Sequence, residues 1–439
     1  MSRQPRRDFL KASALAGAGY FVAGGTTPAL SRSANEKLNI AVVGCGGKGQ
    51  SDTEHAGSQN IVALCDVDDH RGAASFKKFP DAKRYKDFRE MLEKEKSIDA
   101  VVVSTPDHTH APAAAMAIRL GKHVYCQKPL THTVYEARTL RDLAREYKVA
   151  TQMGNQGTAS SGFRQGVEVL QSGAIGPVKE IHVWTNRPIW PQGVERPPAD
   201  QVPAHVDWNL WLGPAPEQAY SKRYVPFSWR GFWDFGTGAL GDMACHTANL
   251  AFMALKLTQP TSIEAESDGS GTDVSPPKQS KIRFEFPASG DRQAVTMFWY
   301  DKSNLPPAEL SHGHKLSDSG LLLVGEKGVF FSPNDYGAAH QLLPEADFKD
   351  YKAPEPSLPR LADDGDNGHM QEFIAACKGG PPAMSNFDYA ANMTEAILLG
   401  NVALRVGKKI LWDAEKLEAT NCPEAAQYVR TEYRSGWTL

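Results

Sequence analysis

An aspartate and a histidine stand four residues apart in a glycine-rich stretch near the middle of the chain. Asp242 and His246 follow the run Gly236–Gly238. This run opens a predicted helix, and residues at positions i and i+4 share one helix face. Such a carboxylate can hold one imidazole nitrogen and leave the other to exchange a proton with a substrate hydroxyl. A capped helix with a fully hydrogen-bonded histidine fits the spacing equally well.

A lysine offers a second group for proton chemistry. Lys128 lies in Gln127-Lys128-Pro129, directly after the predicted strand His123–Cys126. Open α/β sheets bind ligands at the carboxyl ends of their strands. Burial or a neighbouring charge can lower the pKa of a lysine there, so that it exchanges a proton with a hydroxyl. A solvated lysine is the simpler explanation when this pattern is considered alone.

A glycine-rich loop predicts a dinucleotide site. The apolar run 39–43 leads into Gly44-Cys45-Gly46-Gly47-Lys48-Gly49, which has GxGxxG spacing at a strand-to-helix junction. Gly44 allows the tight turn, Gly46 lets backbone N–H groups approach a pyrophosphate, and Gly49 lets helix and strand pack closely. The helix N-terminus then faces the phosphates. The glycine candidates for cofactor binding are Gly44, Gly46, Gly47 and Gly49.

An acidic residue in the right place supports this prediction. Asp66 follows Gly44 by 22 residues, where a Rossmann domain reads the ribose hydroxyls. The acid favours NAD, because a 2′-phosphate would meet the like charges of Asp66 and Asp68. Arg71 could reduce that repulsion, so NADP stays possible.

The first half of the chain alternates β-rich runs with helix-length stretches. Near-continuous apolar strands separated by helices predict a parallel sheet covered on both faces. The predicted strands are 37–43, 61–65, 100–103, 123–126 and 149–153. The predicted helices are 46–57, 68–79, 87–94, 110–120 and 134–147. We therefore predict a doubly wound Rossmann domain over residues 35–154.

The pattern changes after about Met153. Longer alternating runs suit an antiparallel sheet with one exposed face. The predicted strands are 179–185, 262–267, 281–286, 294–300 and 321–331, with helices at 162–172, 370–377 and 390–406. The fold class is therefore α/β. A second α/β domain with a large, mostly antiparallel open sheet is predicted over residues 155–439, for substrate binding and oligomerisation.

Aromatic and polar residues in the middle of the chain indicate a carbohydrate-type ligand. Six of the nine tryptophans fall between positions 184 and 233, in a proline-rich stretch that reads as long loops. Ring faces suit the C–H surfaces of sugars, and polar groups suit their hydroxyls. We nevertheless expect at least half of these rings to pack the loops. The substrate-binding candidates are Asn186, Arg187, Trp229 and Arg230.

Composition excludes several other kinds of protein. The net charge is −3 and no Lys/Arg run stands out, so nucleic acid is not an expected partner. After the N-terminal segment, no apolar stretch reaches the eighteen or so residues that a membrane helix needs. The six cysteines include no CxxC pair and are mostly expected to be small buried residues. The histidines show neither HxxH nor HExxH spacing, so we predict no metal site.

The N-terminus predicts export. Residues Arg6–Lys11 form a twin-arginine pattern, an apolar stretch 12–23 follows, and small residues at 29–31 offer a cleavage site. We predict that residues 1–34 are a signal segment and that the protein is periplasmic. An ordinary basic, frayed terminus is the alternative. The twin-arginine route moves folded proteins, so NAD would be loaded in the cytoplasm and stay tightly bound.

These motifs together resemble the Gfo/Idh/MocA family (glucose–fructose oxidoreductase, inositol dehydrogenase and rhizopine catabolism proteins). The resemblance covers nearly the whole chain after residue 34. It rests on the 44–49 loop, Thr105-Pro106 with His110, Gln127-Lys128-Pro129, Trp229-Arg230 and the stretch 238–246. It implies a Rossmann domain and a second domain whose open sheet often forms a homo-oligomer interface. It also implies NAD(P)-linked oxidation of polyols, sugars or glycosides.

The resemblance also implies roles for single residues. Lys128 matches the family's active-site lysine, and Asp242 and His246 match its Asp-x-x-x-His pair, with His246 the usual acid/base. The cofactor candidates that match positions near the nicotinamide are Thr105, Pro106, His110 and Gln127. Gln127 departs from the family's usual glutamate. A neutral amide cannot balance the lysine's charge, so it would lower the pKa of Lys128 or merely change a hydrogen bond.

Three functions are compatible with these features. The main hypothesis is hydride transfer between NAD(P) and a hydroxyl-bearing carbon of a sugar, polyol or glycoside. Lys128 and His246 would handle the hydroxyl proton, and Asp242 would orient His246. The alternative is a glycosidase or lyase that oxidises a sugar transiently, eliminates and then reduces it again. A non-catalytic NAD-binding sensor is the third, and the presence of all three proton-handling residues argues against it.

Overall fold

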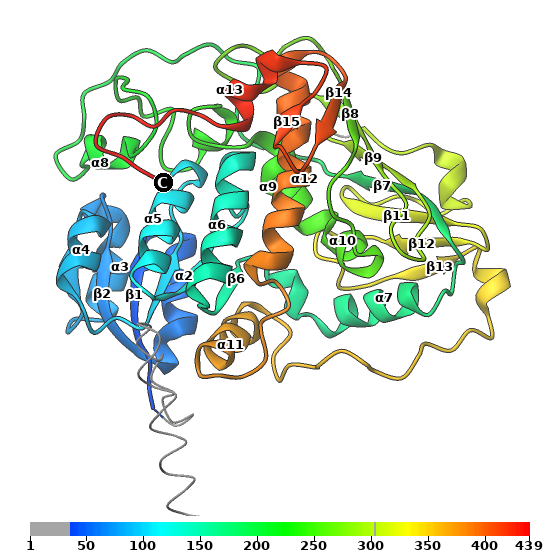
Figure 1. Ribbon diagram of the computed structural model, residues 1–439, viewed down its shortest axis with the longest axis horizontal. Coiled ribbons are helices and arrows are strands. Elements are labelled where there is room, and N and C mark those ends of the chain that lie inside the picture. The colour runs from blue at the N-terminus through cyan, green and yellow to red at the C-terminus, as the bar shows by residue number, and fades with distance from the viewer. Residues whose placement is uncertain (1–35, 303) are drawn as a thin grey trace, which may run out of the picture. The chain divides into compact units, whose positions relative to one another are not determined.

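Two β-sheets organise the described part of the chain (Figure 1). The computed structural model describes residues 36–302 and 304–439, so the predicted signal segment 1–34 lies outside the described residues. Residues Lys37–Leu439 form one compact unit. Within the described ranges, no helix combines the length and apolar character needed to cross a membrane.

The first sheet has six parallel strands in the order β3-β2-β1-β4-β5-β6. They are β1 (Asn39–Val43), β2 (Asn60–Cys65), β3 (Lys83–Tyr85), β4 (Ala100–Val103), β5 (His123–Cys126) and β6 (Thr151–Met153). This is the predicted doubly wound order, in which the ligand crevice opens where the order reverses between β1 and β4. The edge strand β3 escaped prediction because Lys83 and Arg84 are exposed and charged.

Helices cover both faces of this sheet. Those from the first half are α2 (Lys48–His55), α3 (Asp69–Lys78), α4 (Phe88–Lys94), α5 (Asp107–Arg119) and α6 (Val134–Tyr147). The start of α6 shows why the helices begin where they do. Thr133 accepts a hydrogen bond from the backbone N–H of Glu136, whose carboxylate accepts one from the N–H of Thr133. This capping box satisfies two N–H groups that a helix start leaves free.

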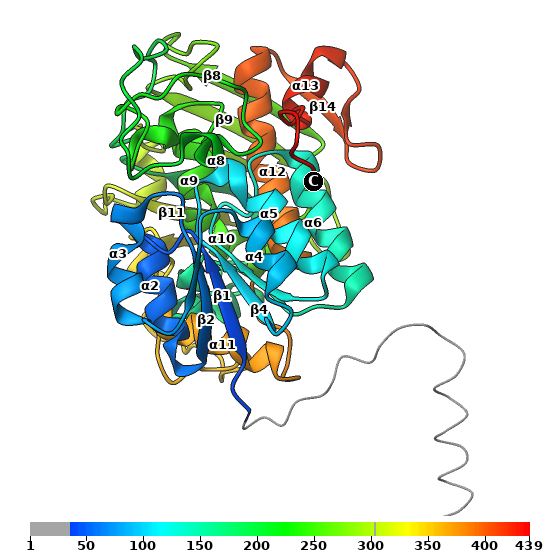
Figure 2. The ribbon, with the colours of Figure 1, turned by 90° about the vertical axis from the view of Figure 1, so that its left-hand side faces the viewer.

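A late helix completes the Rossmann sheet. Helix α11 (Asp366–Cys377) contacts α2 and β6 and is seen near the lower ends of the Rossmann strands in Figure 2. Its residues Met370 and Phe373 belong to the same buried cluster as Ile40 and Val42 of β1. The ring of Phe373 meets that of Tyr125 edge-on, with centroids 5.7 Å apart. The second face of this sheet therefore depends on residues more than 200 positions beyond residue 154, where the predicted first domain ends.

The second sheet has nine strands in the order β13-β12-β11-β7-β10-β9-β8-β14-β15. They are β7 (Val178–Trp184), β8 (Ser262–Ser267), β9 (Ser280–Phe286), β10 (Val295–Tyr300), β11 (Gly320–Gly325), β12 (Val329–Ser332), β13 (Gln341–Leu343), β14 (Ile410–Asp413) and β15 (Glu418–Ala419). Only β7 and β10 pair in parallel, so the sheet is mostly antiparallel, as predicted. The single strand predicted over 321–331 is wrong: the chain turns back at residues 326–328, where Gly325 N–H bonds to Gly328 O at 2.9 Å, and forms the hairpin β11–β12.

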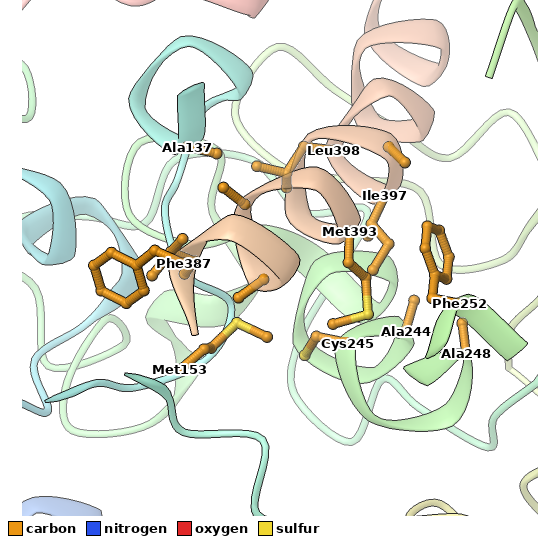
Figure 3. Packing of buried hydrophobic residues seen from close by; sticks show 14 of the residues in the cluster. Ala137, Met153, Ala244, Cys245, Ala248, Phe252, Phe387, Met393, Ile397 and Leu398 are labelled. Carbon is orange, nitrogen blue, oxygen red and sulfur yellow. The ribbon is translucent and has the colours of Figure 1, made fainter. Parts of the chain in front are cut away.

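The inner face of this sheet packs against helices. They are α7 (Ser161–Gln171), α9 (Gly238–Thr247), α10 (Asn249–Leu255) and α12 (Phe387–Val406), while α8 (Trp208–Leu212) and α13 (Ala426–Val429) are short. Helix α12 lies between α6 and β6 on one side and α9 and α10 on the other (Figure 3). Its side chains Met393 and Ile397 are fully buried there. Helix α9, which carries Asp242 and His246, is thereby fixed against the Rossmann half.

Candidate active site

A cavity of about 400 Å³ follows the carboxyl ends of the Rossmann strands. One wall comes from the segments that follow β1, β2, β4 and β5. The other wall comes from the loops between residues 206 and 230, and from Trp437 near the end of the chain. The sequence-predicted residues that line it are Gly44, Gly46, Asp66, Thr105, Pro106, Gln127, Lys128, Trp229 and Arg230. Most of the residues predicted from separate motifs therefore meet at one site.

The glycine loop has the predicted geometry. Gly44 and Gly47 have positive φ angles of 78° and 59°, which glycine adopts without cost. A Cβ on Gly49 would lie 1.7 Å from the carbonyl oxygen of Gly44, so only glycine allows α2 to begin this close to β1. Gly47 and Gly49 shape the loop without lining the cavity.

Asp66 lies where an acid that reads ribose is expected. Its Oδ2 accepts the N–H of Gly46 at 3.0 Å, and its Oδ1 accepts the N–H of Asp68 at 3.0 Å. Burial raises the pKa of Asp66 to about 6, although these two N–H groups favour the charged form. The carboxylate therefore ties the glycine loop to the end of β2 and borders the cavity.

These residues fit an NAD molecule. The glycine cradle and the N-terminus of α2 would hold the pyrophosphate. Asp66 would bind the adenosine ribose, and the cavity continues from there to Lys128. When bound, the nicotinamide supplies a hydride acceptor or donor at that end.

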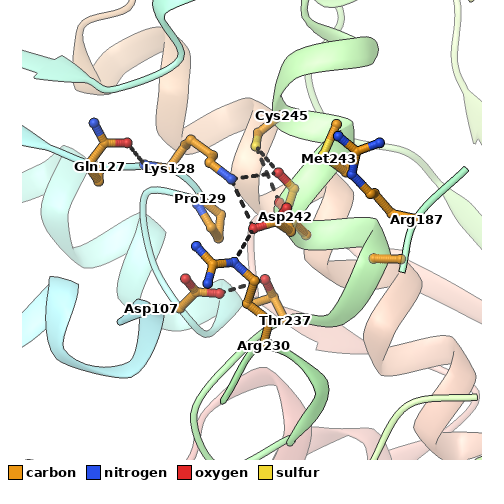
Figure 4. A network of polar contacts seen from close by, with 12 residues as sticks. Asp107, Gln127, Lys128, Pro129, Arg187, Arg230, Thr237, Asp242, Met243 and Cys245 are labelled. Atoms are coloured by element: carbon orange, nitrogen blue, oxygen red, sulfur yellow. Dashed lines mark hydrogen bonds and ion pairs between the residues drawn. The ribbon is translucent and has the colours of Figure 1, made fainter. Parts of the chain in front are cut away.

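Lys128 and Asp242 form a charged cluster with Arg230 (Figure 4). The Nζ of Lys128 donates to Asp242 Oδ1 at 2.9 Å and to Asp242 O at 3.0 Å. The Nε of Arg230 donates to the same Oδ1 at 3.0 Å. Burial alone would raise the pKa of Asp242, but the two cations lower it to about 2.

The same contacts determine the charge of the lysine. Burial opposes the charged form of Lys128, yet the neighbouring carboxylate of Asp242 raises the lysine's pKa above its usual value. The suggestion that Gln127 would leave this pKa lowered is therefore wrong. At neutral pH Lys128 is an ammonium group that donates hydrogen bonds.

His246 differs from its prediction in one respect. No hydrogen bond joins it to Asp242, because that carboxylate bonds to Lys128 and Arg230 instead. The Nδ1 of His246 is buried and has no partner among the described residues. Burial, and then the charge of Lys128, lower the pKa of His246 well below 6.5. His246 is therefore a neutral imidazole at neutral pH.

A buried aspartate accepts the hydrogen bond that the side-chain amide of Gln127 donates. Asp52, on α2, is 1% exposed. Its Oδ2 accepts a hydrogen bond from Gln127 Nε2 at 2.9 Å and another from Ser104 Oγ at 2.7 Å. Its Oδ1 accepts a hydrogen bond from Lys48 Nζ at 2.7 Å. Nothing in the local sequence of α2 signals this role, because the contact joins α2 to the end of β5.

Asp107 is a second carboxylate that the sequence reasoning missed. It is 2% exposed, lines the cavity at the start of α5 and accepts a hydrogen bond from the hydroxyl of Thr237 at 2.8 Å. Burial, and then the charge of Asp242, raise the pKa of Asp107 to about 7. The position of Asp107 directly after Thr105-Pro106 places it at the carboxyl end of β4, but its contact with Thr237 depends on packing between distant elements.

His110 links two loops and does not itself line the cavity. Its two ring nitrogens each lie 2.8 Å from a backbone carbonyl oxygen, Nδ1 from that of Pro129 and Nε2 from that of Thr105. Burial lowers its pKa to about 4. The ring therefore joins the loops that follow β4 and β5.

The predicted substrate residues divide into two groups. The guanidinium of Arg230 lies 4.3 Å from the ring centroid of Trp229, and both line the cavity. Asn186 and Arg187 do not line it, and the guanidinium of Arg187 lies 3.8 Å from the carboxylate of Asp335. Of the six clustered tryptophans only Trp211 and Trp229 reach the cavity, so the expectation that at least half pack elsewhere is confirmed.

No group of three metal-ligating side chains occurs in the described part of the chain.

Comparison with known families agrees with this architecture. A family model described as "Oxidoreductase family, NAD-binding Rossmann fold" matches residues 38–155, and its companion, "Oxidoreductase family, C-terminal alpha/beta domain", matches residues 170–289. Both carry the GFO_IDH_MocA designation. The chain belongs to the Gfo/Idh/MocA family. The N-terminal sheet is therefore an NAD-binding Rossmann domain, as predicted.

Individual relatives are similar over different parts of the chain. The rhizopine catabolism protein MocA of Rhizobium meliloti is 22% identical over 393 residues, which span 88% of this chain and 99% of that protein. The inositol 2-dehydrogenase of Salmonella typhimurium is 28% identical over 124 residues, 28% of this chain and 37% of the dehydrogenase. The solved WlbA dehydrogenase of Bordetella pertussis, in complex with NADH and UDP-GlcNAcA, has a TM-score of 0.60 at 16% identity, covering 86% of this chain and 99% of WlbA. This last likeness confirms the fold.

Proposed function

We propose that the protein transfers a hydride reversibly between NAD and a hydroxyl-bearing carbon of a sugar, polyol or glycoside. The observation that carries this proposal is that a charged Lys128 lines the NAD cavity and bonds to Asp242, one helical turn before a neutral, buried His246 on α9. The Gfo/Idh/MocA relatives named for inositol, and the neighbour solved with a nucleotide sugar, support a substrate of this kind. Trp229 and Arg230 offer a ring face and a cation to such a ligand.

The side chains divide the proton chemistry between them. Lys128 donates a hydrogen bond to the substrate oxygen and stabilises negative charge that develops there. His246 would take the hydroxyl proton as the substrate carbon gives up its hydride. Asp242 holds Lys128 in place and keeps it charged. In the reverse direction the imidazolium of His246 returns the proton.

A screen of sugars, inositols and glycosides tests this proposal, with reduced-nicotinamide absorbance as the readout. Lys128→Ala and His246→Ala should each lower kcat by about 10²–10⁴-fold, the usual contribution of a positioned proton-transfer group. Lys179→Ala removes an exposed lysine on β7 and should change nothing. Cleavage of a glycoside without net NADH formation would identify the glycosidase or lyase instead. Sugar binding without turnover would identify a sensor.

We propose export through the twin-arginine pathway as the setting for this activity. The support is the Arg6–Lys11 pattern, which lies outside the described residues. Because free NAD is scarce outside the cytoplasm, the cofactor should stay bound and be recycled by a second substrate. Replacing Arg6 and Arg7 by lysine should retain the protein in the cytoplasm, as cell fractionation would show.

We propose that the protein is a homo-oligomer that assembles through the open face of the nine-stranded sheet. Along β9 the side chains alternate, with Ile282, Phe284 and Phe286 buried and Lys281 and Arg283 exposed on the other face. Light scattering during size-exclusion chromatography measures the assembly. A monomeric protein at micromolar concentration would contradict this proposal.

A further inference from the structure

The last ten residues of the chain, the C-terminal tail (430–439), reach the NAD cavity from the far end of the sequence. The tail follows the short helix α13 and runs toward α5 and α8 (Figure 1). It lies beyond both family matches, the second of which ends at residue 289. Its residue Trp437 nevertheless lines the same cavity as the glycine loop.

Hydrogen bonds fix the tail at three points. The hydroxyl of Tyr433 donates to Glu136 Oε1 of α6 at 2.6 Å. The guanidinium of Arg434 donates to Asn209 O at 2.8 Å and, through Nε, to Gly213 O at 3.1 Å. The Nη1 of Arg89 donates to Gly436 O at 3.0 Å. The tail is therefore bound to the Rossmann half and to the loops that form the opposite cavity wall.

The indole of Trp437 is itself held in position. The guanidinium carbon of Arg89 lies 4.1 Å from its ring centroid, and the ring of Phe88 lies 5.8 Å away. Arg89 is oriented in turn by Asp87, whose Oδ2 accepts its Nη2 at 2.7 Å. Arg89 does not reach the cavity, whereas Trp437 does. The indole is thus a fixed part of the cavity wall.

The position of the Trp437 ring places it at the end of the cavity where the adenosine half of the dinucleotide is expected. Trp437 shares its end of the cavity with Lys86, Asp87 and Phe88, which follow β3, the strand next to β2. The acid after β2 reads the ribose of the adenosine half in a Rossmann domain. The catalytic cluster at Lys128 follows β5, on the other side of β1 and β4.

We infer that Trp437 is the adenine-side wall of the NAD site, and that its indole contacts the adenine ring of the bound cofactor. This inference depends on NAD binding but not on the identity of the substrate. Contact between a base and an aromatic side chain is strong and needs no hydrogen bond. A residue supplied by the C-terminal tail thereby helps to retain the cofactor.

The test compares cofactor fragments on Trp437→Ala protein from which bound NAD has been removed. We expect ADP and NAD to bind roughly ten- to a hundredfold more weakly than to the parent protein, the usual loss for one base–aromatic contact. Nicotinamide mononucleotide, which lacks adenine, should bind as before. Dissociation of NAD in a chase with unlabelled NAD should accelerate by the same factor.

Two further variants distinguish loss of the contact between indole and adenine from a general disturbance of the C-terminal tail. Trp437→Phe keeps a ring and should recover most of the ADP affinity. Leu439→Ala shortens a side chain of the same tail that does not line the cavity and should leave all three affinities unchanged. Unchanged ADP binding in Trp437→Ala would overturn the inference, as would an equal loss for ADP and nicotinamide mononucleotide. Failure of the parent protein to bind NAD or ADP would overturn the proposed function as well.

Discussion

Two buried carboxylates of the active-site cluster have opposite protonation behaviour. Asp242 is bonded to two cations, and its pKa of about 2 keeps it ionised. Asp107 accepts a hydrogen bond from a neutral hydroxyl, that of Thr237, and is buried near the charge of Asp242, so its pKa is about 7. Asp107 is therefore the carboxyl of this cluster that changes charge near neutral pH.

This difference predicts a pH dependence that disappears in Asp107→Asn. The charged groups that act on Asp107 are Asp242, Arg230 and Lys128. Below pH 7 Asp107 is neutral and the cluster carries a net positive charge, which opposes the cationic nicotinamide of NAD⁺. Above pH 7 it is ionised and the cluster is neutral. We expect kcat/KM for alcohol oxidation to rise through about pH 7, by at most about tenfold per pH unit.

Steady-state pH profiles of parent and variant check this prediction. In Asp107→Asn the rise near neutrality should be absent, and the rate should resemble that of the parent at low pH. Thermal unfolding of the variant controls for loss of fold. A variant that retains the full rise would assign the titration to another group.

Residue types and spacing identified the reactive groups but not their partners. Lys128, Asp242 and His246 were predicted from short motifs and lie in one region. Asp52 and Asp107 could not be assigned from sequence, because each gains its role from a side chain that packing brings from another element. The prediction of a hydrogen bond between Asp242 and His246 was wrong, because packing brings Lys128 and Arg230 to the Asp242 carboxylate instead.

At the level of elements, the approach of α2 to β1 makes a sharp prediction about Gly49. An alanine Cβ there would overlap the carbonyl oxygen of Gly44 at 1.7 Å, so loop and helix must separate. We expect Gly49→Ala to lose NAD during purification, as the absorbance of the protein would show. Gly57→Ala is the matched control, because its Cβ would meet a phenylalanine ring at an ordinary 3.4 Å. Equal NAD content in both variants would contradict this account.

Helix α11 makes a second prediction at this level. Phe373 is fully buried against the Rossmann sheet, so Phe373→Ala should reduce the free energy of unfolding by about 3–5 kcal/mol. Leu411→Ala, at a side chain that is 44% exposed, should have little effect. Denaturant titration measures both. Similar values for the two variants would show that α11 contributes little to the stability of this sheet.

Elements were predicted best where the local pattern is decisive. Strands β4, β5 and β8 and helix α6 have the predicted bounds. A buried run of valines marks β4 locally, and a capping box marks the start of α6. The hairpin β11–β12 was merged into one strand because its turn is short and both arms are apolar. The role of α11 in completing the Rossmann sheet depends on a long-range return of the chain, which no local pattern encodes.

At the scale of the whole molecule, both sheets should unfold together. Residues Lys37–Leu439 form one compact unit, and α12 is buried between the helices of both halves. We expect one calorimetric transition. Adding NAD at a hundredfold excess over its Kd should stabilise the protein by about 2.7 kcal/mol and raise Tm. Two transitions, of which NAD shifts only the first, would show that the halves are independent.

The two walls of the cavity are synthesised at different times, because they come from different parts of the chain. One wall is complete once residue 128 has emerged, but the opposite wall needs residues 206–230 and then residue 437. A nascent chain can therefore form the glycine loop early and still lack most of the surface that encloses a dinucleotide. Full enclosure of NAD therefore requires that translation has passed residue 437.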